Sequence, residues 1–170
     1  MAYVQLNDLA EQPGATELSQ VATPIRYSAV DYDLLDAMLR GRDTSGWPAD
    51  EVEIAQLVIA VIVEARTDAD GVIDGFLAKR GYKLPLIKVF PLVVHWSRVI
   101  TRYFLHKNRQ ALESNDPIVR DYKDALKFLQ MVAEGKFSLG EDDTLTPPNS
   151  AAPKTCHPPR VFTTESLKDY

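Results

Sequence analysis

The feature that most constrains the fold of this 170-residue chain is a helical repeat of apolar side chains in its middle. Residues at that spacing share one face of an α-helix, so the segment of about 49–79 is predicted to be a long amphipathic helix and the spine of the core. The run LVIAVIV within it is rich in β-branched residues, but the helical spacing continues for several turns beyond that run. The repeat consists of Ile54, Leu57, Val58, Val61, Ile62, Ala65, Ala69, Val72, Ile73 and Phe76.

Two more helices are predicted after this spine, each between identifiable start and stop residues. Gly81 ends the spine, and Leu84-Pro85-Leu86 forms an extended turn. Pro91 opens the next helix, because a missing amide hydrogen costs nothing in the first turn. Asn115-Asp116-Pro117 combines a capping side chain with such a proline and opens the last helix, which ends at Gly135.

Shorter helices are predicted in front of the spine. One begins at Asn7 and, after a break at Pro13-Gly14, a second begins at Thr16, because Asn and Thr side chains favour helix starts. A further helical segment ends at Gly41. We therefore predict an all-α fold, a small helical bundle of three main helices plus short N-terminal helices. The segment before Gly41 carries apolar residues at helical spacing: Val30, Leu34, Leu35, Met38 and Leu39.

The composition changes at residue 141. The stretch EDDTLTPPNSAAPKTCHPPR holds five prolines and one large aliphatic side chain, Leu145. So little apolar surface does not offset the entropy cost of ordering the chain. Residues 141–170 are therefore predicted to be an extended, Pro-rich C-terminal arm on a helical domain of residues 1–140. The expected anchors of this arm to a partner are Leu145, Val161, Phe162, Leu167 and Tyr170.

Charge is divided unevenly along the chain. Residues 1–78 carry 4 Lys/Arg and 14 Asp/Glu, residues 79–136 carry 12 and 5, and residues 137–170 carry 3 and 5. An acidic half and a basic half favour contact with nucleic acid or with an oppositely charged neighbour, and ordinary local ion pairs are the alternative. Basic side chains concentrate on the helix after Pro91 and at its exit. These candidate subunit or DNA contacts are Arg98, Arg102, Lys107 and Arg109.

No arrangement of residues indicates catalysis or metal binding. Asp68, Asp70 and Asp74 lack the glycine and the bidentate glutamate of a calcium loop, so these aspartates are expected on the solvated face of their helix. Cys156 and His157 lie together in the arm without a second pair of zinc ligands. The chain contains no phosphate-binding glycine loop and no nucleophilic serine motif. We therefore predict no catalytic residues, no cofactor and no metal.

Neither a signal peptide nor a membrane span is predicted. The most apolar run, Leu57 to Val63, is far shorter than the roughly 18 residues that cross a bilayer. No charged-then-apolar segment precedes a cleavage site near the N-terminus. The single cysteine cannot form an internal disulfide, so nothing indicates an oxidising compartment. We expect a soluble protein made in a cytoplasm.

Residues 63–140 contain a distinctive series of motifs: ADGVIDGFLAKRGYKLPL, a helix entered through Pro91, YKDALKFL and GKFSLG. A weaker match lies at residues 3–21. In this order the motifs resemble the small head–tail connector (adaptor) proteins of Mu-like tailed phages and prophages. Residues 23–50 depart from the compact form of that family and are interpreted as an insertion in the connector domain. The Pro-rich arm is a second departure.

The resemblance implies a structural virion protein without catalytic residues. It implies a homo-oligomer, a dodecameric ring beneath the portal protein that also contacts a tail-side neck or stopper protein. Genome DNA would pass through the lumen without sequence-specific binding. The implied location is the neck of the virion, after assembly in the host cytoplasm. Alternative interpretations are a small helical nucleic-acid-associated regulator that uses the basic second half, or a tail-completion protein.

Overall fold

The computed structural model describes residues 2–107, 116–140 and Leu145. The elements are α1 (Leu6–Leu9), the π-helical turn η1 (Ala10–Gly14), α2 (Ala15–Ala22), α3 (Tyr32–Leu39), α4 (Ala49–Arg80), α5 (Pro91–Lys107) and α6 (Pro117–Ala133). No strand occurs within those ranges, which confirms the predicted all-α fold. The extended form predicted for the arm falls, apart from Leu145, outside the described residues.

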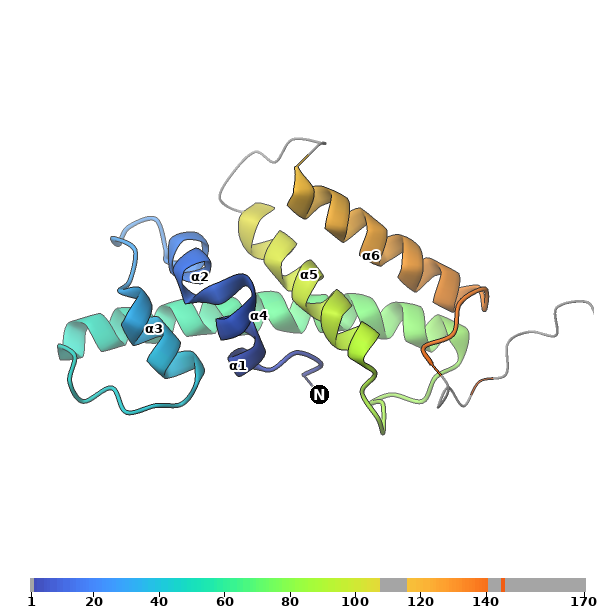
Figure 1. The fold of residues 1–170 in the computed structure, drawn as a ribbon, viewed down its shortest axis with the longest axis horizontal. Coiled ribbons are helices and arrows are strands. Elements are labelled where there is room, and N and C mark those ends of the chain that lie inside the picture. Colours follow the sequence, from blue (N-terminus) through green and yellow to red (C-terminus); the bar gives the residue numbers. More distant parts are fainter. Residues whose placement is uncertain (1, 108–115, 141–144, 146–170) are drawn as a thin grey trace, which may run out of the picture.

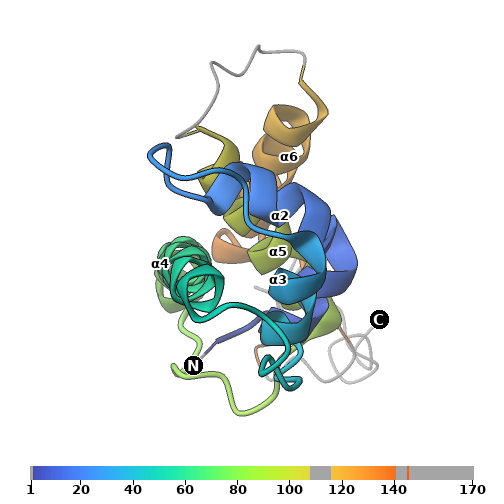
Figure 2. The same cartoon turned by 90° about the vertical axis from the view of Figure 1, so that its left-hand side faces the viewer.

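The long helix α4 is the spine on which α2, α3, α5 and α6 pack. The N-terminal helices α1 to α3 lie along its first half, and α5 and α6 lie along its second half (Figure 1). In the view turned by 90° the other helices lie on one side of α4 (Figure 2). One face of α4 is therefore buried along its length, as the apolar repeat predicts.

The core consists of two apolar clusters that meet α4 in succession. Ala55, Val58 and Ile62 of α4 pack with the N-terminal helices in the first cluster. Ile73 and Leu77 pack with α5 and α6 in the second. Helix α3 lies in the segment interpreted as an insertion, and it contributes fully or nearly fully buried side chains to the first cluster: Leu34, Leu35 and Leu39.

The predicted ends of the three main helices agree with the structure. Gly81 ends α4 in the left-handed conformation, with φ of 101°, and its N–H bonds to carbonyls of the last turn. Asp116 caps α6, because its carboxylate accepts the Ile118 N–H at 2.7 Å. Pro117 occupies the first turn of α6 and Pro91 begins α5. Gly135 has a positive φ of 75° just beyond the end of α6.

The starts of the two front helices differ from the prediction. Helix α1 begins at Leu6, and Asn7 lies inside it, where its side-chain oxygen accepts a hydrogen bond from Arg40 at 3.1 Å. Helix α2 begins at Ala15 after Gly14, so Thr16 lies in its first turn and does not open it. The predicted break at Pro13-Gly14 takes the form of η1, in which Gln12 has non-helical backbone angles. At the start of α1 the local cap is made by Asp8, whose carboxylate accepts the Gln5 N–H at 3.0 Å.

Candidate docking surface

The basic face of α5 is joined to α2 inside the chain. The guanidinium of Arg102 donates two hydrogen bonds to the Glu17 carboxylate, from Nε at 2.6 Å and from Nη2 at 2.8 Å. His106 Nε2 lies 2.8 Å from the same carboxylate. A bidentate arginine–carboxylate pair is a strong, directional contact. Arg102 therefore stabilises the packing of α2 on α5, and much of its charge is neutralised within the chain.

The ionisation of Glu17 reflects this environment. Burial alone raises the pKa of its carboxyl, but the hydrogen bonds from Arg102 and His106 outweigh burial and hold the pKa below its ordinary value of 4.5. The carboxylate form is thus favoured in the folded protein. The junction is an ion pair at neutral pH.

The other predicted basic contacts have different surroundings. Arg98 donates from Nη1 to the Gln12 side chain at 2.7 Å, and its buried Nε has no hydrogen-bond partner among the described residues. Lys107 Nζ lies 4.2 Å from the centre of the Phe104 ring, as in a cation–π contact. Arg109 lies outside the described residues. As a set of subunit or DNA contacts, these four residues stay a prediction.

A buried carboxylate fixes the N-terminal segment to the spine. Asp70 is only 7% exposed and accepts the Tyr3 backbone N–H at 3.1 Å and the Ser97 hydroxyl at 2.7 Å. Tyr3 also donates its phenolic hydroxyl to Asp74. Burial raises the pKa of Asp70, against the effect of its two hydrogen bonds. The expectation that Asp70 lies on a solvated face was wrong, since α5 and the N-terminal segment cover that part of α4.

Leu145 is the one predicted arm anchor inside the described region. It lines an apolar pocket of about 540 Å³ beside the loop between α4 and α5, together with Tyr82, Leu86 and Phe90. Ile87, at the rim of this pocket, is 99% exposed. Leu145 therefore lies close to the beginning of α5. The remaining anchors lie outside the described residues: Val161, Phe162, Leu167 and Tyr170.

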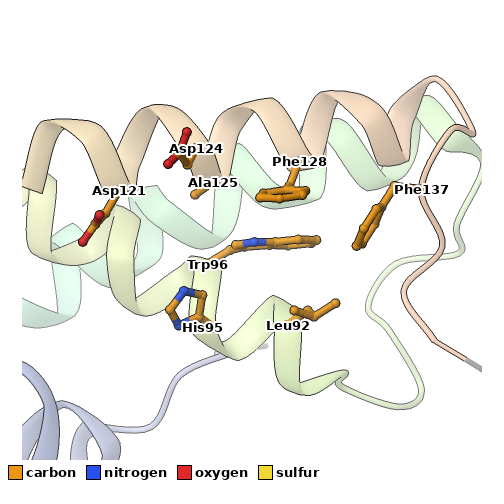
Figure 3. Close-up of a pocket in the computed structure, with 8 residues that line it drawn as sticks. All are labelled: Leu92, His95, Trp96, Asp121, Asp124, Ala125, Phe128 and Phe137. Carbon is orange, nitrogen blue, oxygen red and sulfur yellow. The ribbon is translucent and has the colours of Figure 1, made fainter. Parts of the chain in front are cut away.

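A second pocket, of about 310 Å³, lies between α5 and α6. Its floor is aromatic, because Trp96 stacks on Phe128 with ring centres 6.5 Å apart and an angle of 16° between the planes. Phe137 closes the same end, whereas Asp121 and Asp124 lie at the other end (Figure 3). Trp96 is 3% exposed and Phe128 is 40% exposed, so the stack is open on the Phe128 side.

Sequence reasoning did not find this pocket. Leu92 and Trp96 are one helical turn apart on α5, and Asp121, Asp124 and Phe128 follow helical spacing on α6, so each stripe could have been recognised. Nothing local indicates that the two stripes face each other. Their opposition depends on the antiparallel packing of α5 on α6.

The structure defines a small all-α protein with two apolar pockets at the beginning of α5. Within the described ranges, no three His, Cys, Asp or Glu side chains are grouped so that they could hold a metal ion. In the same ranges no helix is long and apolar enough to cross a membrane.

Comparison with known proteins assigns the family. Residues 3–156 match the family model described as Bacteriophage Mu, Gp36, and the chain belongs to that family. It is 39% identical over 102 residues to the Mu-like prophage FluMu protein gp36 of Haemophilus influenzae, covering 58% of this chain and 69% of that protein. It is 30% identical over 106 residues to Gene product J of Escherichia phage Mu, covering 62% of this chain and 65% of that protein. No solved structure was found to match. The resemblance to Mu-like phage proteins is thereby confirmed.

Proposed function

We propose that the protein is a head–tail connector, an adaptor that forms a ring beneath the portal of a Mu-like phage particle. The ring joins the DNA-filled head to the tail and lets the genome pass through its lumen. Membership of the Mu Gp36 family supports a role in phage particles. The motif series from residue 63 to 140 supports the connector role within them.

The observation that carries this proposal is the arrangement at the beginning of α5. The apolar pocket lined by Leu145 and the exposed Ile87 lie there, beside the loop between α4 and α5. Exposed apolar surface of this kind marks contacts with other proteins. A rigid helical body with such a surface and a Pro-rich arm fits a protein whose work is to hold other subunits together.

The distribution of exposed charge supports a ring. Asp50, Glu51 and Glu53 are exposed at the beginning of α4, and the exposed Lys123 and Lys127 lie beside the exposed Asp124 on α6, over the second half of α4 (Figure 1). In a cyclic assembly each subunit uses two different surfaces, one toward each neighbour. Acidic and basic surfaces at opposite ends of the molecule are suited to such head-to-tail contact. We propose twelve copies, from the resemblance to connector proteins.

The proposed partners are the portal protein on the head side and a neck or stopper protein on the tail side. The proposed location is the neck of the virion, and the function requires no catalytic residue, cofactor or metal. DNA would slide through the ring without sequence-specific contacts. The internal pairing of Arg102 with Glu17 reduces the positive charge that α5 offers to phosphates, which favours the connector over the nucleic-acid regulator.

Inactivation of the gene in an inducible prophage tests the proposal. We expect full heads and separate tails in the lysate, with few joined particles, and we expect infectivity to return when the wild-type gene is supplied in trans. Joined, infectious particles from the inactivated prophage would exclude a connector role. An early block, with no heads and no tails, would instead support the regulator.

A further inference from the structure

We propose that the segment Pro158-Pro159-Arg160 of the C-terminal arm docks in the pocket between α5 and α6 of its own chain. This inference does not depend on the connector role. It rests on the chemistry of the pocket, on the sequence of the arm and on the position of Leu145.

The pocket has the chemistry of a site for proline-rich peptides. Phe128, which is 40% exposed, and the partly exposed Phe137 present their rings to the pocket over the buried Trp96, with ring centres 5.4 to 6.5 Å apart. Aromatic grooves bind proline-rich segments because a polyproline helix is already extended and loses little entropy on binding. The volume of about 310 Å³ accommodates a few side chains, as a short peptide contact requires.

The negative charge at one end of the pocket favours one of the two Pro-Pro pairs of the arm. The acidic end of the pocket, with Asp121 and Asp124, lies beside the aromatic floor (Figure 3). The arm contains two Pro-Pro pairs, and only Pro158-Pro159 is followed by a cation, Arg160, whereas Pro147-Pro148 is followed by Asn149. A rise of about 3.1 Å per residue in a polyproline helix puts Arg160 within reach of the carboxylates while the prolines contact the rings.

The position of Leu145 and the length of chain that follows it favour docking within one chain. Leu145 lies in the pocket that includes Phe90, and Leu92, two residues further along the chain, lines the pocket between α5 and α6. His157 lies twelve positions after Leu145 in the chain, and a flexible chain of that length spans roughly 20 Å. A tether of this length gives an effective concentration on the order of millimolar, well above the protein concentration of a dilute sample.

The single cysteine of the chain provides a direct test. Cys156 lies two residues before Pro158, and docking brings it to the aromatic end of the pocket, near Leu92. In full-length Leu92→Cys protein, mild oxidation should form a disulfide between residues 92 and 156 within one chain. Non-reducing gels and peptide mass spectrometry detect this bond. The matched control is Ile25→Cys, because Ile25 is 84% exposed and lies on the turn between α2 and α3.

The proposal is tested by the rate at which the disulfide within one chain forms. We expect the Leu92→Cys protein to close its disulfide roughly tenfold faster than the Ile25→Cys protein, through the higher effective concentration. Adding Pro158→Ala and Pro159→Ala should remove that advantage, and adding Pro147→Ala and Pro148→Ala should preserve it. Asp121→Lys with Asp124→Lys should slow closure, and Arg160→Glu should restore it in that background.

Equal rates for the two cysteine positions, or disulfide-linked dimers in place of closed monomers, would overturn the proposal. If Leu92→Cys unfolds the protein, as circular dichroism would reveal, His95→Cys replaces it. His95 is exposed at the rim of the same pocket, so its replacement leaves the core intact.

Discussion

At the scale of single residues, two carboxylates join parts of the chain that lie far apart in the sequence. Glu17 binds Arg102 and His106 across the contact between α2 and α5. Asp70 binds the backbone of Tyr3 and the side chain of Ser97. Both carboxylates are at least partly buried, so water does not fully replace a lost hydrogen-bond partner. Removing either contact should therefore lower the free energy of unfolding.

Replacing Glu17 with Gln should lower the free energy of unfolding by about 1–2 kcal/mol at pH 7, since the variant loses a charged, bidentate contact. The folded-state pKa of Glu17 lies below its ordinary value of 4.5. Its stabilising contribution is therefore complete above that value and is lost as the pH falls through the lower folded-state pKa.

Urea unfolding of wild type and Glu17→Gln at several pH values measures this effect. The difference between the two proteins should shrink as the pH falls below about 4.5. The exposed Glu53→Gln variant is the control and should differ little from wild type at any pH. A constant Glu17→Gln difference from pH 7 to pH 3 would refute the ion-pair account.

Asp70→Ala should destabilise the protein by about 2–3 kcal/mol, because it leaves a buried amide and a buried hydroxyl without their acceptor. Asp68→Ala is the matched control, since Asp68 is an exposed carboxylate on the same helix. Thermal unfolding of the two variants gives the comparison. Similar losses for both would mean that the contact of Asp70 with Tyr3 and Ser97 contributes nothing specific.

At the scale of elements, α4, α5 and α6 follow from local signals. Each of these signals determines the structure of the few residues around it: the apolar repeat, the prolines that open α5 and α6, and Gly81. The sequence alone therefore locates these helices to within about two residues. The burial of Asp70 and the opposition of Trp96 and Phe128 depend on which helices meet. No local sequence pattern indicates which side chains more than 20 residues apart will contact each other. The sequence analysis therefore did not predict the pocket.

Glycine substitutions inside α4 and just beyond its end should act in opposite directions. Gly81→Ala places a side chain on a residue with φ of 101°, which costs about 1–2 kcal/mol. Gly71 lies inside α4 with nothing within 4 Å of an added Cβ, so Gly71→Ala should stabilise by about 0.5–1 kcal/mol. Thermal unfolding measures both changes. Stabilisation by Gly81→Ala would contradict the assigned end of α4.

At the scale of the whole molecule, the proposed function gives the helical body and the arm separate roles. The two core clusters described above consist of side chains of the helical body, and Leu145 packs against the second cluster. Family membership places the chain among Mu-like phage proteins. The body would build the ring, and the arm would contribute contacts at its surface.

Deleting residues 146–170 should leave a body that unfolds within a few degrees of wild type, because both core clusters remain. Phage that carry this deletion should give heads and tails that do not join, as electron microscopy and plaque counts would reveal. Normal infectious particles from the deletion would remove the arm from the mechanism of joining. An unfolded truncated protein would instead contradict the independence of the helical body.

The position of the protein in the phage particle tests the central claim most directly. Purified particles that carry an epitope-tagged copy of this chain can be labelled with antibody and imaged by electron microscopy. The connector account predicts label at the junction of head and tail, with ring-shaped density at that position in averaged images. Particles that are infectious yet lack the chain, or that carry label only elsewhere, would contradict it.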